Sequence, residues 1–158
     1  MGITGKSGDN HRYFTSMFIG EYQHNLDIKG RLALPAKFRK QIKGAIITRG
    51  LDRCLWVFNK SEWELLAKKL IALPLAQANS RAFVRLMMAG AMEAPLDFQG
   101  RILIPDYLRK YADLQKAAII AGLYNRLEIW DEKQWQQYKS KTEASSDDIA
   151  EKLGELGI

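Results

Sequence analysis

The chain carries two copies of one motif, and this duplication limits the folds open to it. The segment DIKGRLALPAKFRK at 27–40 recurs as DFQGRILIPDYLRK at 97–110, and residues 45–63 match 118–135 in the same chain order. Repetition at a fixed spacing indicates a duplicated structural unit. Because one unit of this length with few, short strands buries little surface, the two copies are expected to fold together.

Each unit is expected to begin with two short strands around a tight turn. Alternating apolar residues precede and follow Ile28-Lys29-Gly30, which is typical of a β-hairpin. Gly30 and Gly100 supply the positive φ that such turns commonly need, and Asp27 and Asp97 carry carboxylates able to bond turn amides. Short helices are expected after the turns, starting at Pro35 and Pro105.

The rest of each unit combines a second strand pair with a helix. Residues 45–48 and 55–58 form the expected pair in the first unit, as do 118–121 and 127–130 in the second. Ser61 to Glu64 reads as a capping box opening a helix, and the matching helix starts near Asp131. A further helix is expected over 77–91, followed later by a loose connection over 140–148.

These elements predict an α+β fold in which two strand-rich halves pack about a pseudo-twofold axis. The axis should bring the turns at 27–31 and 97–101 close together. The expected divisions are a disordered leader or tag at 1–16, a first unit at 17–72, a linking helix at 73–94, a second unit at 95–140 and a tail helix at 141–158.

Positive charge is concentrated in the first half of the chain. The net charge of +6 divides into +8 over residues 17–86 and −3 over 87–158, with the remainder before residue 17. Such an excess favours polyanionic partners such as nucleic acid, although lysines that serve only solubility give the same count.

Motifs of catalysis and of cofactor or metal binding are absent from the sequence. It has only two histidines, His11 and His24, one cysteine, Cys54, and no phosphate-binding, dinucleotide-binding or zinc motif. Asp27 and Asp97 suit a hydrolase in principle, but each has an arginine four residues on, which fits an ion pair that stabilises the turn better. We therefore expect no enzyme, no cofactor, no metal site and no small-molecule substrate.

The repeated turns present cations and amides suited to DNA. Arginine grips guanine or phosphate bidentately, lysine pairs with phosphate, and glutamine reads adenine. The alternative is that Arg31 and Arg101 only pair with Asp27 and Asp97; the two roles are compatible. The candidate DNA contacts are Lys29, Gly30, Arg31, Gln99, Gly100 and Arg101. Arg39 and Lys40 are candidate phosphate contacts. The alternative is that these two residues only form a solvated face of their helix.

The sequence contains no apolar run long enough to cross a bilayer and no apolar segment near its start typical of a signal peptide. A cytoplasmic protein without a membrane partner is expected.

From Met17 onward the chain closely resembles the MraZ family of bacterial transcriptional regulators. The resemblance rests on MFIGEYQHNLDIKGRLALPAKFR and on the second signature DFQGRILIP, which together give a duplicated D-x-x-x-R. It implies two AbrB/SpoVT-like swapped-hairpin units packed as a pseudo-dimeric barrel with surrounding helices. It also implies a ring-shaped homo-oligomer, associated with the nucleoid, that binds short G-rich direct repeats in double-stranded DNA upstream of its own division and cell-wall operon.

Carried over by position, the resemblance assigns DNA contacts to Lys29, Arg31 and Arg101, with Asp27 and Asp97 holding the loops. Gln99 stands where the first copy has Lys29, so the second loop is less cationic. The alternative function is a non-enzymatic module whose basic first half binds RNA or an acidic protein.

Overall fold

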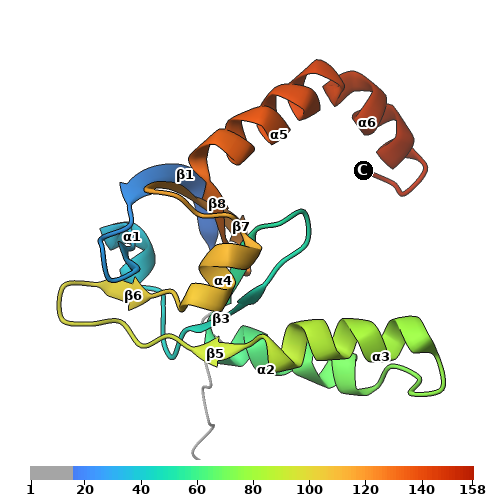
Figure 1. The fold of residues 1–158 in the computed structure, drawn as a ribbon. Coiled ribbons are helices and arrows are strands. Elements are labelled where there is room, and N and C mark those ends of the chain that lie inside the picture. The colour runs from blue at the N-terminus through green and yellow to red at the C-terminus, as the bar shows by residue number, and fades with distance from the viewer. Residues whose placement is uncertain (1–15) are drawn as a thin grey trace, which may run out of the picture.

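A six-stranded antiparallel sheet forms the body of the computed structural model, which describes residues 16–158 (Figure 1). Its strand order is β1-β7-β8-β4-β3-β5, so strands of the two units share one sheet rather than forming separate sheets. The strands are β1 (Phe18–Asn25), β7 (Ala117–Tyr124), β8 (Leu127–Asp131), β4 (Leu55–Phe58), β3 (Ile46–Arg49) and β5 (Met92–Glu93).

A separate two-stranded ribbon joins the repeated motifs. Strand β2 (Arg31–Ala33) pairs antiparallel with β6 (Arg101–Leu103), and Leu32 lies opposite Ile102. These two residues are equivalent in the repeat and both are fully buried, so the pseudo-twofold axis passes between them. The expectation that the two turns lie close together about such an axis is confirmed.

The expected hairpins are wrong in their pairing. Strand β1 pairs with β7 and β2 pairs with β6, so both strands around the first turn find partners in the second unit. A local pairing would bury one apolar face per unit, whereas the exchange brings Leu32, Leu34, Ile102 and Ile104 into one shared core. No closed barrel is found within residues 16–158, where the large sheet stays open and the ribbon is a second, two-stranded sheet that shares its core.

The second strand pairs are confirmed. Strand β3 pairs with β4, and β7 pairs with β8. β4 and β8 then meet at the centre of the sheet, where Trp56 lies opposite its repeat equivalent Glu128 and donates its indole N–H to that carboxylate at 2.8 Å. Cys54 lies beside them, fully buried, and burial raises the pKa of its thiol, in keeping with a packing role.

Short helices follow the ribbon in both units. Pro35 and Pro105 precede α1 (Ala36–Arg39) and α4 (Asp106–Tyr111) by one residue rather than forming their first residues. Phe38 and Leu108 point into the core and are fully buried.

The long helices differ from expectation at their ends. No side-chain hydrogen bond caps α2 (Lys60–Ile71), which begins one residue before the proposed capping box. Asp131 does cap α5 (Glu132–Ala144), accepting the backbone N–H of Gln134. The loose connection expected over 140–148 is wrong, because α5 continues through the boundary at 140/141 and only Ser145 separates it from α6 (Ser146–Gly154).

The linking segment is only partly helical. Within the expected range 73–94, α3 (Ala78–Val84) runs into a π-helical turn over Arg85–Ala89, and Met92–Glu93 form β5 beside β3. The leader expected at 1–16 lies outside the described residues apart from Ser16, whose hydroxyl accepts the amide of Asn59.

Candidate nucleic-acid interface

The first loop is built around the carboxylate of Asp27. One oxygen, Oδ1, accepts the backbone N–H groups of Lys29 and Arg31, both at 2.9 Å. The other, Oδ2, accepts the Nε–H of Arg31 at 2.6 Å. A short polar side chain that bonds the backbone two residues on is the usual way that Asp stabilises a turn. The aspartate therefore shapes the loop and aims the arginine at the same time.

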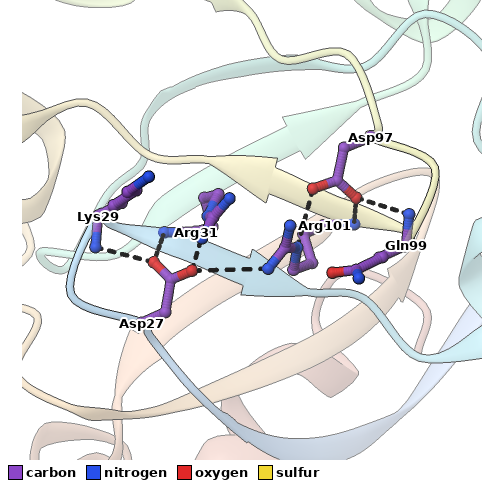
Figure 2. Close-up of polar contacts among 6 residues, drawn as sticks. All are labelled: Asp27, Lys29, Arg31, Asp97, Gln99 and Arg101. Atoms are coloured by element: carbon purple, nitrogen blue, oxygen red, sulfur yellow. Dashed lines mark hydrogen bonds and ion pairs between the residues drawn. The ribbon is translucent and has the colours of Figure 1, made fainter.

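The second loop repeats this arrangement. Asp97 Oδ1 accepts the backbone N–H groups of Gln99 and Arg101 at 2.9 Å each, and Oδ2 accepts Arg101 Nε–H at 2.8 Å. The two loops also touch, since Nη1 of Arg101 lies 3.7 Å from Asp27 Oδ2. Figure 2 shows Arg31 and Arg101 near the middle of the ribbon, with Lys29 and Gln99 toward its two ends.

Hydrogen bonding keeps both aspartates ionised. The pKa of Asp27 is lowered, chiefly by the backbone N–H of Arg31 and with help from its guanidinium. The pKa of Asp97 is lowered in the same way by Arg101. Because each carboxylate is occupied by three donors, neither is placed as a free general acid or base. The ribbon is suited to binding rather than to hydrolysis.

Both loop glycines are required by the backbone and by close neighbours. Gly30 has φ +81° and Gly100 has φ +74°, in the left-handed region. A Cβ at Gly100 would meet the side chain of Arg39, and a Cβ at Gly30 would meet that of Arg109. Each loop is thus supported by an arginine from the helix of the other unit.

The candidate phosphate contacts on α1 differ from each other. Arg39 is half-buried and donates its Nε–H to the carbonyl of Leu34, so part of its guanidinium is committed to the ribbon. Lys40 is exposed at the end of the same helix. Arg39 is thereby placed against the second loop, and Lys40 is placed at the surface.

Three residues at the ribbon were not among the candidate contacts. Arg109 lies behind Gly30, and the signal for it was its alignment with Arg39 in the repeat. Ile28 and Phe98 occupy the loops beside Lys29 and Gln99, and their exposed fractions are 98% and 95%. The sequence did not predict that these two apolar residues, at equivalent positions in the two loops, would be almost fully exposed. Alternating apolar residues in a sequence indicate burial instead.

Other kinds of site lack support in the part of the chain that the structure describes. Residues 16–158 hold no cluster of three or more His, Cys, Asp or Glu side chains arranged to bind a metal. None of the helices described there combines the length and apolar character needed to span a bilayer.

Comparison with known proteins agrees with the repeat. The family model described as "MraZ protein, putative antitoxin-like" matches twice, over residues 17–86 and 87–155. The chain is 50% identical to the "Transcriptional regulator MraZ" of Halothermothrix orenii over 143 residues, which cover 90% of this chain and all of that protein. Proteins of the same name from Pediococcus pentosaceus, at 49% identity, and Alkaliphilus oremlandii, at 50%, match with the same coverage. The chain belongs to the MraZ family.

Proposed function

We propose that this protein is a sequence-specific DNA-binding transcriptional regulator whose β2–β6 ribbon contacts DNA. The observation that carries the proposal is the pair of Asp–Arg loops, which hold two arginines side by side with Lys29 and Gln99 beyond them. A two-stranded ribbon is one of the elements that the major groove admits. The names of the relatives point to the same class of function.

The chemistry of the ribbon divides into positioning and reading. Lys29 is exposed and suited to phosphate, which contributes affinity without sequence information. Arg31 and Arg101 carry guanidinium forks that match guanine O6 and N7, and Gln99 matches adenine. Ile28 and Phe98 add apolar side chains suited to the methyl group of thymine. Both direct reading and phosphate contact are therefore available on one narrow surface.

A single ribbon neutralises few phosphates, so one subunit is expected to bind weakly at physiological salt. We propose that several subunits in a homo-oligomeric ring engage short direct repeats upstream of the protein's own operon. Binding of one subunit raises the effective concentration of the next, so the array gains affinity without a new contact. The site of action would be the nucleoid.

The test is fluorescence anisotropy on duplex DNA from immediately upstream of the protein's own gene, over a series of salt concentrations. The unmodified protein should bind this duplex at least about tenfold more tightly than a scrambled duplex. Arg31→Ala should lose about 1–3 kcal/mol of that preference, the value of one bidentate base contact. Lys133→Ala is the matched control, because it removes one exposed positive charge from α5, away from the ribbon.

Three results would overturn the proposal. Equal binding to scrambled DNA, or an effect of Arg31→Ala no larger than that of Lys133→Ala, would leave the Asp27–Arg31 pair a structural feature. Tighter binding to single-stranded RNA than to the upstream duplex would favour the alternative of an RNA-binding module.

A further inference from the structure

Helix α6 has no packing partner among the described residues that would stabilise it. Every residue from 141 to 158 is exposed, and the backbone hydrogen bonds of this segment are local, such as that from Ile149 N–H to the Ser145 carbonyl. Isolated helices shorter than about 12–15 residues are marginal in water. Since α6 has nine residues, its stability must come from contacts that one copy of the chain does not supply.

The chemistry of α6 defines what it would contact. Ile149 and Leu153 are spaced four residues apart, which places them on one side of the helix, and Leu156 follows in the turn after it. Their exposed fractions are 40%, 38% and 74%. Residues 146–158 carry an excess of negative charge, with the acidic residues Asp147, Asp148, Glu151 and Glu155 against the single basic residue Lys152. Its partner should offer an apolar groove bordered by positive charge.

The first unit of the same chain has such a surface. A groove of about 280 Å³ lies between α2 and β4, with Phe58, Leu65 and Leu66 on its apolar walls. Lys69 and Arg126 line it as well, while Glu62 is its one carboxylate. Along the chain at this side of the molecule, residues 68–85 hold four basic residues and no acidic one. We call this surface the α2 groove.

Helix α6 lies away from the α2 groove of its own chain. Figure 1 shows α5 and α6 leaving the sheet on one side while α2 and α3 extend along another, well separated in the view. Helix α5 is held to the sheet by Trp135 and Lys139, which both bond the carboxylate of Glu21 on β1. These contacts fix the direction of α5, and α6 follows at its far end, away from the groove in this view.

We propose that α6 of one copy of the chain docks into the α2 groove of a second copy. The contact joins two different surfaces of the same molecule, the acidic apolar helix of the second unit and the basic apolar groove of the first. Such a head-to-tail contact leaves one free helix and one free groove on every pair, so it propagates into a ring or a filament. The inference rests on the homo-oligomer of the proposed function and names the surfaces that build it.

The test measures the mass of the full-length chain in solution by light scattering after gel filtration. Leu153→Asp alters the helix, and Leu65→Asp alters the groove. Each should reduce the oligomer to a monomer, because a carboxylate would be buried without a partner. Leu75→Asp is the matched control, since it makes the same change at an exposed leucine between α2 and α3 outside the groove. It should keep the mass of the unmodified protein.

Mixing the two altered proteins gives a sharper result. Leu153→Asp retains an intact groove and Leu65→Asp retains an intact helix, so an equimolar mixture should form a heterodimer of twice the monomer mass and nothing larger. A variant that failed to fold would form no such pair, and its circular dichroism would show the failure. A monomeric unmodified protein, a variant that keeps the full oligomer, or a mixture of folded variants without heterodimer would each overturn the proposal.

The outcome is separable from that of the DNA proposal. The monomeric variants retain the ribbon, so they should show weak binding to the upstream duplex that still depends on Arg31. If the mass results hold while Arg31→Ala has no effect on DNA, the docking contact stands and the DNA function fails.

Discussion

The two units of the chain agree closely at their loops and differ at their edges. In the first loop the three hydrogen bonds to the aspartate measure 2.9, 2.9 and 2.6 Å, and in the second they measure 2.9, 2.9 and 2.8 Å. The strands that precede the loops are very unequal by comparison. Strand β1 has eight residues, whereas its counterpart β5 has two.

This difference follows from the range of the contacts involved. Each loop depends mainly on one carboxylate that bonds residues two and four positions later, so most of its geometry is set within the loop itself. The edge strands depend on partners far away in sequence, and in the second unit the residues before β5 form a helix instead. The two Asp–Arg loops are therefore alike while the outer helices differ, and α6 and the α2 groove, which we propose to dock between copies, both belong to these outer parts.

The largest effect that tests this comparison is expected at the loop glycines. Gly100→Ala should lower the free energy of unfolding by about 1–3 kcal/mol, the usual cost of a strained backbone conformation. The new Cβ would also meet Arg39, which is held by its bond to Leu34. Gly30→Ala should cost less, because its nearest neighbour, Arg109, lies farther away. Urea denaturation of both variants measures the difference.

Gly154 provides the control for these substitutions. It lies at the end of α6, no atom lies within 4 Å of the position that an added Cβ would occupy, and its φ is not positive. Gly154→Ala should leave stability unchanged or raise it slightly, because alanine favours the helix. Equal losses at all three glycines would show that the loops are not the constrained positions.

A smaller effect should distinguish the two aspartates. Their folded pKa values are lowered, so each stabilises the fold above its unfolded pKa of about 3.9, and this contribution disappears as the pH falls through the folded value. Asp27→Asn and Asp97→Asn should both reduce stability at pH 7, and Asp27→Asn should reduce it more, because Asp27 also receives Arg101.

Urea denaturation at about pH 7 and pH 3, on either side of the unfolded pKa, measures this prediction. The deficit of both Asn variants relative to the unmodified protein should shrink at the lower pH, because there the unfolded chain takes up protons on these carboxylates more readily than the folded chain does. A deficit that stays constant with pH would mean that the shape of the side chain, and not its charge, stabilises the loops.

Much of this arrangement was predictable because the repeat is strong. Aligning the copies identified Asp27 with Asp97 and Gly30 with Gly100, and turn chemistry then predicted their hydrogen bonds and positive φ. The pairing of β1 with β7 was not predictable from the local pattern, because alternation in a strand shows that one face is buried but does not say against which strand. The contacts of Arg39 and Arg109 with the opposite loops depend on the pairing of β2 with β6, which the local pattern also left open, and they were missed for the same reason.

The helix ends show a different limit of the sequence. Residues 140–148 are polar, and polarity is as typical of an exposed helix as of a loop. α5 continues into this region although none of its side chains is buried. Ile28 and Phe98 give the opposite error, since apolar side chains suggest a core while here they are almost wholly exposed. In both cases the sequence shows correctly which residues are polar and which are apolar. It does not show that the polar residues form an exposed helix, or that Ile28 and Phe98 lie at the surface.

The smallest effect concerns the one charge that differs between the loops. Lys29→Gln makes the first loop resemble the second, and Gln99→Lys does the reverse. Both side chains are exposed and neither is part of the hydrogen-bond set around the aspartates, so stability should change by less than about 0.5 kcal/mol.

Each phosphate contact contributes about 0.9 to the slope of log affinity against log salt concentration. For one loop, Lys29→Gln should reduce the slope by about that amount, and Gln99→Lys should increase it by the same amount if the second loop reaches phosphate. Anisotropy on the upstream duplex over a series of salt concentrations measures both slopes. If only Lys29→Gln changes the slope, the first loop alone contacts the DNA backbone. If only Gln99→Lys does, the assignment of the phosphate contact to Lys29 is wrong.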